Sequence, residues 1–115
     1  MDLNGKWRYR EQYGYGMAEG ELTLEQEDGK LFGRVIFTDK TEDGKVSMIQ
    51  EFLEGEVEGR KVWLEAREFD VIHSDFKMEY ELDSWFGVLV EPSVIKGVSI
   101  DGQGVEGYFL FEKIS

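Results

Sequence analysis

The sequence predicts an all-β fold, an eight-stranded antiparallel up-and-down (meander) β-barrel, and three observations lead to it. Turn signals recur at nearly regular intervals, apolar and polar residues alternate with period two between them, and a glycine recurs within nearly every segment. At 115 residues the chain has the length of one domain, so residues 1–115 are expected to form a single barrel.

Seven turn signals divide the chain into eight segments. Asp-Gly between alternating hydrophobic residues is the strongest short-range indication of a hairpin, because the tightest hairpin turns need positive φ. The turns are expected at Gly14–Gly16, Asp28-Gly29, Thr41–Gly44, Glu58-Gly59, His73–Asp75, Glu91–Ser93 and Asp101–Gly104.

Alternation identifies the segments as half-buried strands. In the second segment Leu22 and Leu24 alternate with polar residues, and in the sixth the same pattern runs over residues 76–82. The continuation, Asp83–Val90 (DSWFGVLV), is the one segment open to interpretation as a helix, since a short helix or an irregular crossing there would interrupt the strand pattern.

The repeated glycines favour closure of the sheet. A glycine within a strand usually marks strong coiling or close backbone approach, and such glycines around a sheet let its strands bend into a barrel. Each is followed at +2 by a residue that can face inward: Gly5/Trp7, Gly20/Leu22, Gly33/Val35, Gly55/Val57, Gly87/Leu89, Gly97/Ser99 and Gly107/Phe109.

The first segment sets the polarity of the barrel. Trp7 is expected inside, near the start of the strand, where a large indole forms the floor of the barrel. Tyr9, Glu11 and Tyr13 share its parity and follow it towards the other end. Residues of opposite parity, such as Arg8, face water.

The stretch LNGKWRYR resembles the Gly-x-Trp opening of the calycin superfamily, which comprises lipocalins, fatty-acid-binding proteins and avidins. The length, the eight segments and the hairpin GELTLEQEDGKLFGRV are most similar to avidin-like or short lipocalin-like members. The resemblance implies a barrel that is closed beneath Trp7, open at the other end, and able to hold a small ligand. The positions where biotin-binding members carry an Asn and a Ser have Tyr9, Glu11 and Tyr13 here, so biotin is not expected.

The composition and charge limit the classes of partner that the protein is expected to bind. The net charge is −12, but acidic residues are interleaved with Lys and Arg, and the basic stripe that nucleic-acid binding requires is missing. The acidic residues are expected on solvated strand faces or, alternatively, on a surface for a basic partner. The sequence has no cysteine, no membrane-length apolar run and no signal peptide, which favours a cytoplasmic protein without membrane association; a processed secreted form would look the same.

No motif indicates catalysis. His73, in DVIHSD, is the only histidine, and with no cysteine it supports no standard metal site, so no metal, cofactor or catalytic residue is expected. We therefore expect a protein that is not an enzyme; the alternative is an isomerase or lyase on a calycin-like barrel.

The ligand site is expected at the open end. Meander topology places the connections Tyr13–Gly16, Asp39–Gly44, Asp70–Asp75 and Asp101–Gly104 there, and Asp28-Gly29, Glu58-Gly59 and Asp83–Ser93 at the closed end. The predicted ligand-binding residues are Tyr9, Glu11, Tyr13, Tyr15, Phe37, Glu51, His73, Tyr80 and Phe109. The acidic pair of Glu11 and Glu51 favours a cationic or hydroxylated amphiphile over a fatty acid. In the alternative, side chains fill the lumen and the protein acts through its acidic outer surface or as a homo-oligomer.

Apolar residues at outward positions indicate that part of the wall is covered. Phe32, Ile36, Tyr108 and Leu110 are expected to form a homo-oligomer interface, such as that of a dimer. The alternative cover is the segment Ser84–Val90, folded back across the wall.

Overall fold

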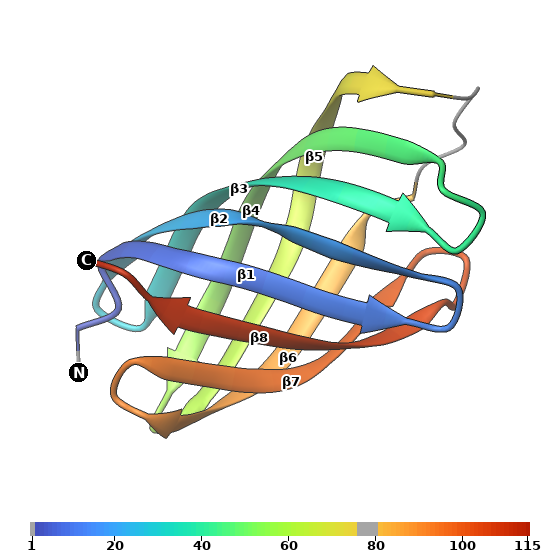
Figure 1. Ribbon diagram of the computed structural model, residues 1–115. Coiled ribbons are helices and arrows are strands. Elements are labelled where there is room, and N and C mark those ends of the chain that lie inside the picture. The colour runs from blue at the N-terminus through green and yellow to red at the C-terminus, as the bar shows by residue number, and fades with distance from the viewer. Residues whose placement is uncertain (1, 76–80) are drawn as a thin grey trace.

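The computed structural model describes residues 2–75 and 81–115, and it confirms a closed barrel of eight antiparallel strands in chain order (Figure 1). Each strand pairs with the next, and β8 closes the barrel by pairing with β1. The strands are β1 Gly5–Tyr13, β2 Gly16–Glu27, β3 Lys30–Thr41, β4 Val46–Glu58, β5 Lys61–Ser74, β6 Asp83–Glu91, β7 Val94–Asp101 and β8 Glu106–Lys113.

Glycines permit the coiling that closes the sheet. Gly20 lies between Tyr9 of β1 and Phe37 of β3 in the strand register. A Cβ atom on Gly20 would lie 1.9 Å from the carbonyl oxygen of Ile36, which is impossible without backbone movement. The two aromatic rings meet edge to face, 5.7 Å apart, near the gap that this glycine leaves.

The core is a continuous cluster of apolar side chains inside the barrel. Its largest fully buried members are Trp7, Trp85, Tyr9 and Phe111. Phe111 lies against Tyr9 with ring centroids 5.5 Å apart, and Tyr9 meets Trp85 edge to face at 6.3 Å. Aromatic side chains, packed among buried Leu, Ile and Val side chains, therefore fill the lumen, as side chains do in other small barrels.

The closed end is sealed by the N-terminal segment. The indole Nε1 of Trp7 donates a hydrogen bond to the Leu3 carbonyl oxygen at 3.0 Å, and both residues are completely buried. The Leu3 amide in turn donates to Gln26 Oε1 on β2 at 2.9 Å. The two chain termini lie at this end (Figure 1), where Lys113 Nζ stands 5.8 Å from the Trp7 ring centroid.

Asp83–Val90 forms neither a helix nor an irregular crossing, because this segment belongs to the strand β6. Trp85 and Leu89 face the core, while Phe86, Val88 and Val90 face outward and are exposed. Asp83 consequently lies at the open end, and the closed-end connection begins only after Glu91. The segment Ser84–Val90 is part of the wall and does not cover it. The alternation predicted over residues 76–82 falls mostly on residues 76–80, outside the described residues.

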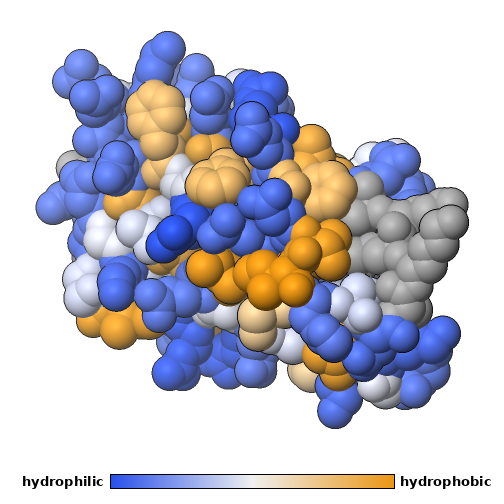
Figure 2. Space-filling view, turned by 90° about the horizontal axis from the view of Figure 1, so that it is seen from above, coloured by the Kyte–Doolittle hydropathy of each residue, from blue (hydrophilic) through white to orange (hydrophobic). Residues whose placement is uncertain are grey.

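The four outward residues predicted as one interface lie on two separate walls. Phe32 and Ile36 are on β3, Tyr108 and Leu110 are on β8, and β1 and β2 lie between these strands. Figure 2 shows the face that carries β3 and parts of β4 and β5, where orange apolar side chains form a band broken by blue hydrophilic ones.

Candidate functional site

A small pocket lies at the open end of the barrel, which we call the mouth pocket. Its volume is about 60 Å³. It is lined by Tyr9, Glu11, Tyr13, Tyr15, Ala18, Phe37, Asp39, Asp83, Asp101 and Val105. A cavity needs roughly 10–15 Å³ of such volume to hold one water molecule, so the pocket has room for a small functional group and not for a whole drug-sized ligand.

Glu11 is the central polar group of the mouth pocket. Its Oε1 accepts a hydrogen bond from the Tyr9 hydroxyl at 2.7 Å and another from the Trp85 indole Nε1 at 3.2 Å. Burial raises the pKa of Glu11 to about 7; the hydrogen bonds from Tyr9, Ser99 and Trp85 oppose this rise, while the negative charge of Asp83 adds to it. Glu11 therefore exchanges its proton near neutral pH.

Space for the Glu11 carboxyl group is provided by Gly107 on β8. A Cβ atom on Gly107 would lie 3.2 Å from Glu11 Oε2, 3.0 Å from Ser99 Oγ and 2.9 Å from the Gln12 carbonyl oxygen. Because all three distances are shorter than ordinary contacts, a side chain at this position would press on the carboxyl group and on its Ser99 partner. The absence of a side chain at Gly107 thus leaves room for the Glu11 carboxyl group in the mouth pocket.

A second acid–tyrosine pair forms the rim of the mouth pocket. The Tyr13 hydroxyl donates a short hydrogen bond to Asp39 Oδ1. Burial raises the pKa of Asp39, which the Tyr13 hydrogen bond opposes, and burial also raises the pKa of Tyr13. The Tyr15 ring meets the Tyr13 ring edge to face at 5.0 Å and is half-exposed. Tyr15 therefore stands between the pocket and solvent.

Turn contacts hold this rim in place. The Tyr15 carbonyl oxygen accepts a hydrogen bond from the Glu42 amide at 2.8 Å, which joins the β1–β2 turn to the β3–β4 turn. Asp101 Oδ1 accepts from the amides of Gln103 and Val105, both at 2.9 Å, and so orders the β7–β8 turn. The mouth pocket is consequently built on fixed hairpin ends.

Five of the nine predicted ligand-binding residues line this pocket: Tyr9, Glu11, Tyr13, Tyr15 and Phe37. Phe109 lies in the core against Phe111, with ring centroids 4.7 Å apart. Glu51 is fully buried on β4, opposite Val35 and Phe69, and is not part of the lining. Tyr80 lies outside the described residues.

His73 does not reach the lumen. It lies exposed on β5, opposite Met48, and its Nε2 is 2.9 Å from Asp75 Oδ1. This pair belongs to the outer surface. Among residues 2–75 and 81–115, no group of three or more His, Asp or Glu side chains is arranged to hold a metal ion.

Sequence reasoning missed Asp39, Asp83 and Asp101 in the lining, and Trp85 behind Glu11. Asp39 carried a usable signal, because it follows Phe37 at the same inward parity. The sequence pattern places Asp101 in a turn, and Asp83 and Trp85 in the expected crossing. With 25 acidic residues in the chain, acidity alone could not distinguish the three aspartates.

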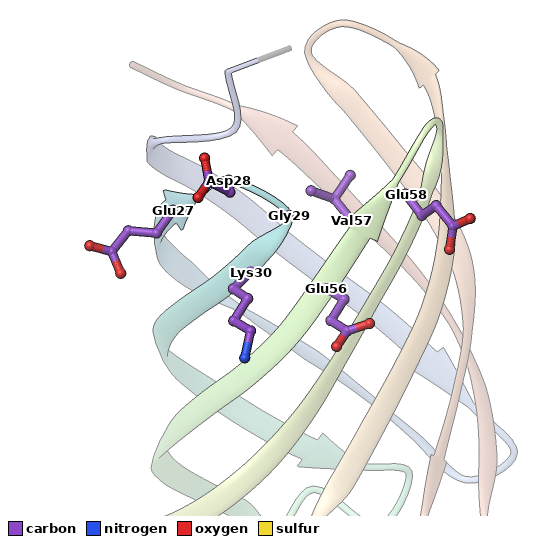
Figure 3. A pocket seen from close by; sticks show the side chains of 7 residues that line it. All are labelled: Glu27, Asp28, Gly29, Lys30, Glu56, Val57 and Glu58. Carbon is purple, nitrogen blue, oxygen red and sulfur yellow. The ribbon is translucent and has the colours of Figure 1, made fainter.

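A larger hollow of about 710 Å³ lies at the closed end, on the outer surface between the β2–β3 turn and the end of β4 (Figure 3). Its floor is closed by a hydrogen bond from the Val57 amide to the Gly29 carbonyl oxygen at 2.8 Å. The side chains of Lys30 and Glu56 run in the same direction along the wall, while Glu27 and Glu58 point away from each other (Figure 3). Since its polar groups do not converge, this hollow is not the candidate site.

Fold and site together define a small antiparallel barrel with a closed floor and an acidic, tyrosine-rich mouth. No protein-family model matches the sequence, and no curated protein sequence matches it. No helix in the described part of the chain is both long and apolar enough to cross a membrane.

The chain is similar in structure to designed β-barrels. The redesigned barrel mFAP1, bound to DFHBI, superposes with a TM-score of 0.67 at 9% identity, over 96% of this chain and 94% of that one. EF1p2_mFAP2b, also bound to DFHBI, superposes with a TM-score of 0.69 at 7% identity, over 97% of this chain and 94% of that one. A de novo designed fluorescence-activating β-barrel superposes with a TM-score of 0.62 at 14% identity, over 97% of this chain and 94% of that one. At these identities the likeness is one of fold.

Proposed function

We propose that the protein binds a small amphiphilic molecule at the open end of the barrel and that the mouth pocket receives a cationic or hydroxylated group of that molecule. The observation that carries the proposal is the lining: three tyrosines and four carboxyl groups meet around about 60 Å³. Ligand pockets commonly combine an aromatic wall with a few convergent polar groups.

Charge favours an ammonium group or a hydroxyl group over a carboxylate. Neither lysine, arginine nor histidine is among the residues that line the pocket in the described part of the chain. A cation there would be attracted by the carboxylates and by the faces of the tyrosine rings, whereas a ligand carboxylate would be repelled. A hydroxyl group could donate to Glu11 or Asp39.

The small volume of the mouth pocket limits which part of a ligand can enter it. Because the mouth pocket holds only about 60 Å³ above a packed core, only the polar end of a ligand fits, and its apolar part would lie outward against the half-exposed Tyr15. The designed barrels bound to DFHBI support the proposal, since they hold a small molecule on the same fold. The proposal is of a binding protein and not of an enzyme.

The second candidate is a barrel without a small-molecule ligand, which acts through its outer surface. The packed aromatic cluster of Tyr9, Trp85, Phe37 and Phe111 favours it, because these buried rings contact one another inside the barrel and occupy space that a ligand would need. The two candidates differ in whether the mouth pocket takes up a group from solution.

Three compounds of equal size separate the possibilities: benzylamine, benzyl alcohol and benzoate. Titration of each into the ¹⁵N-labelled protein at neutral pH should shift the indole resonance of Trp85 with the amine and the alcohol, but not with benzoate. Glu11→Gln should weaken the amine response at least several-fold. Asp43→Asn, in the exposed β3–β4 turn, should leave it unchanged.

If neither the amine nor the alcohol shifts the mouth resonances, the binding proposal is wrong and the filled-barrel candidate stands. Equal responses from all three compounds would overturn the assignment of a cationic or hydroxylated ligand.

A further inference from the structure

The outer wall of β5–β8 carries a row of exposed apolar side chains. In the strand register Trp63 lies opposite Phe86, Phe86 opposite Val98, and Val98 opposite Tyr108. Their exposed fractions are 45%, 46%, 48% and 76% respectively. We call these four residues the apolar row. Exposed apolar patches of this kind typically mark interaction surfaces.

The two rows that flank the apolar row carry opposite charge. On the side of the closed end, the register aligns Lys61, Val88, Lys96 and Leu110, which we call the basic row. On the side of the mouth it aligns Glu65, Ser84, Ile100 and Glu106, which we call the acidic row. The wall is therefore ordered as basic, apolar and acidic.

This order is self-complementary. If two copies face each other across a two-fold axis that runs along the apolar row, each apolar residue meets its own counterpart. The same rotation lays the basic row of one copy over the acidic row of the other. Lys61 then faces Glu65 of the second copy, and Lys96 faces Ile100, next to Glu106. A closed two-fold contact needs this property, since both copies use the same surface.

We propose that two copies of this chain associate through the wall of β5–β8, with their apolar rows in contact and their charged rows crossed. The crossed charges commit this surface to a second copy, because an unrelated partner would have no reason to match both flanks.

The curvature of the wall fits this contact. The wall bends away from a flat partner, so two facing barrels diverge towards the outer strands, β5 and β8. Trp63 and Tyr108 stand on those strands, and Phe86 and Val98 form the middle of the row. Phe86 and Val98 would therefore form the centre of the contact, where the residues that contribute most to binding usually lie, and Trp63 and Tyr108 would lie at its edges.

The charge of the whole molecule favours the same wall. Each copy carries −12, so contact between two acidic faces is repulsive. The contact proposed here brings carboxylates against lysines instead. It also explains the exposed Lys96, whose nearest outward neighbours across the strands are the apolar Val88 and Leu110.

A charge-swap experiment tests the proposal. Variant one carries Lys61→Glu and Lys96→Glu, so that both flanks are acidic; variant two carries Glu65→Lys and Glu106→Lys, so that both are basic. In sedimentation velocity at about 100 μM, where mass action favours dimers, the wild type should have twice the 13.3 kDa mass of one chain. Each variant alone should be a monomer, and an equimolar mixture should form a heterodimer.

Matched controls carry the same change in net charge on another wall. Arg34→Glu with Lys40→Glu, on β3, takes the charge from −12 to −16, because each change removes two units, as in variant one. Glu19→Lys with Glu25→Lys, on β2, takes it to −8, as in variant two. Both controls should remain dimeric, and circular dichroism should show the barrel intact in all variants.

Tryptophan fluorescence gives a second readout. Trp7 and Trp85 are buried in a single chain, and Trp63 is half-exposed, so association should shift the emission of Trp63 to shorter wavelength as concentration rises. A wild type that stays monomeric at about 100 μM would overturn the proposal. So would a dimer that survives in both charge variants, or a mixture of the two variants that fails to associate.

Discussion

The two ends of the barrel are built from different chemistry on the same eight strands. At the closed end Leu3 and Trp7 are completely buried, and the polar atom of the indole is satisfied by one backbone carbonyl oxygen. At the mouth, Glu11 and Asp39 are partly buried and are held by tyrosine hydroxyls, and none of the described lining residues is a lysine or arginine. Stability is thus concentrated at the floor, and the mouth holds charge at an energetic cost, which is the usual sign of a site kept for function.

The largest expected effect is at the floor. Trp7→Ala should destabilise the protein by about 3–5 kcal/mol, because it empties a large buried volume and leaves the Leu3 carbonyl oxygen without its donor. Urea unfolding measures this loss. A loss below about 1 kcal/mol would mean that the floor is not where the barrel is anchored. Lys6→Ala, exposed on the same strand, is the control.

At the mouth, Glu11 should make stability depend on pH. The folded-state pKa is raised from 4.5 to about 7, so the folded state binds the proton more tightly than the unfolded state does. Stability should therefore fall as pH rises from 4.5 to about 7 and then level off, by at most about 3 kcal/mol for this group.

Glu11→Gln removes this titration. It should flatten the profile and raise stability at pH 8 relative to the wild type, as measured by urea unfolding at several pH values. Asp39, whose pKa is also raised, will leave a smaller slope of the same sign. A wild-type profile that rises between pH 5 and pH 7 would contradict the assignment.

Gly107→Ala should have an intermediate effect at the mouth. The added methyl group presses on Glu11 Oε2, Ser99 Oγ and the Gln12 carbonyl oxygen, with an expected loss of about 1–3 kcal/mol. The double variant Gly107→Ala with Glu11→Ala should recover part of this loss. If the two losses simply add, the glycine does not serve the carboxyl group.

The smallest effect is expected at the rim. Tyr15 is half-exposed, so Tyr15→Ala should change stability by less than about 1 kcal/mol. The same substitution should weaken the benzylamine response described above. Large destabilisation would show that Tyr15 belongs to the core, and the contrast between floor and mouth would then be weaker than proposed.

Much of this barrel could be predicted because most strands have one solvent-exposed face and one buried face, which gives alternating polar and apolar residues. Where a strand is apolar on both faces, the pattern disappears: Phe86, Val88 and Val90 face outward beside the inward Trp85 and Leu89, so Asp83–Val90 does not alternate. The exposed apolar side chains that obscured β6 in the sequence belong to the wall proposed as a dimer interface.

The site was predicted in part for a related reason. Every second residue from Trp7 onward is predicted to face inward on β1. These residues are Tyr9, Glu11 and Tyr13, and all three line the mouth pocket or its rim. On β5 parity fails, because the β4–β5 pairing shifts register between Met48 and Ile49 and again between Phe52 and Leu53. Each shift turns the following side chains to the opposite face, and no residue in the sequence indicates it. The two shifts cancel beyond residue 72, so His73 has the outward parity that the inward Leu64 sets and lies opposite the exposed Met48; it was expected at the mouth from its place in a turn and not from its parity.

The seam between β5 and β6 is short. Its described pairs number five, from Lys61↔Val88 to Glu65↔Ser84, whereas β2 and β3 share twelve. Among the described pairs this seam is the shortest of the barrel, so we expect the barrel to open there first, because the fewest of those hydrogen bonds must break. Brief opening would swing β6–β8 away from β1–β5 about the β8–β1 junction and admit solvent to Trp85 and Leu64. Amide exchange in native conditions should then be faster at Lys61–Glu65 than along β2, which would show that the barrel opens at this seam while the β8–β1 junction acts as the hinge.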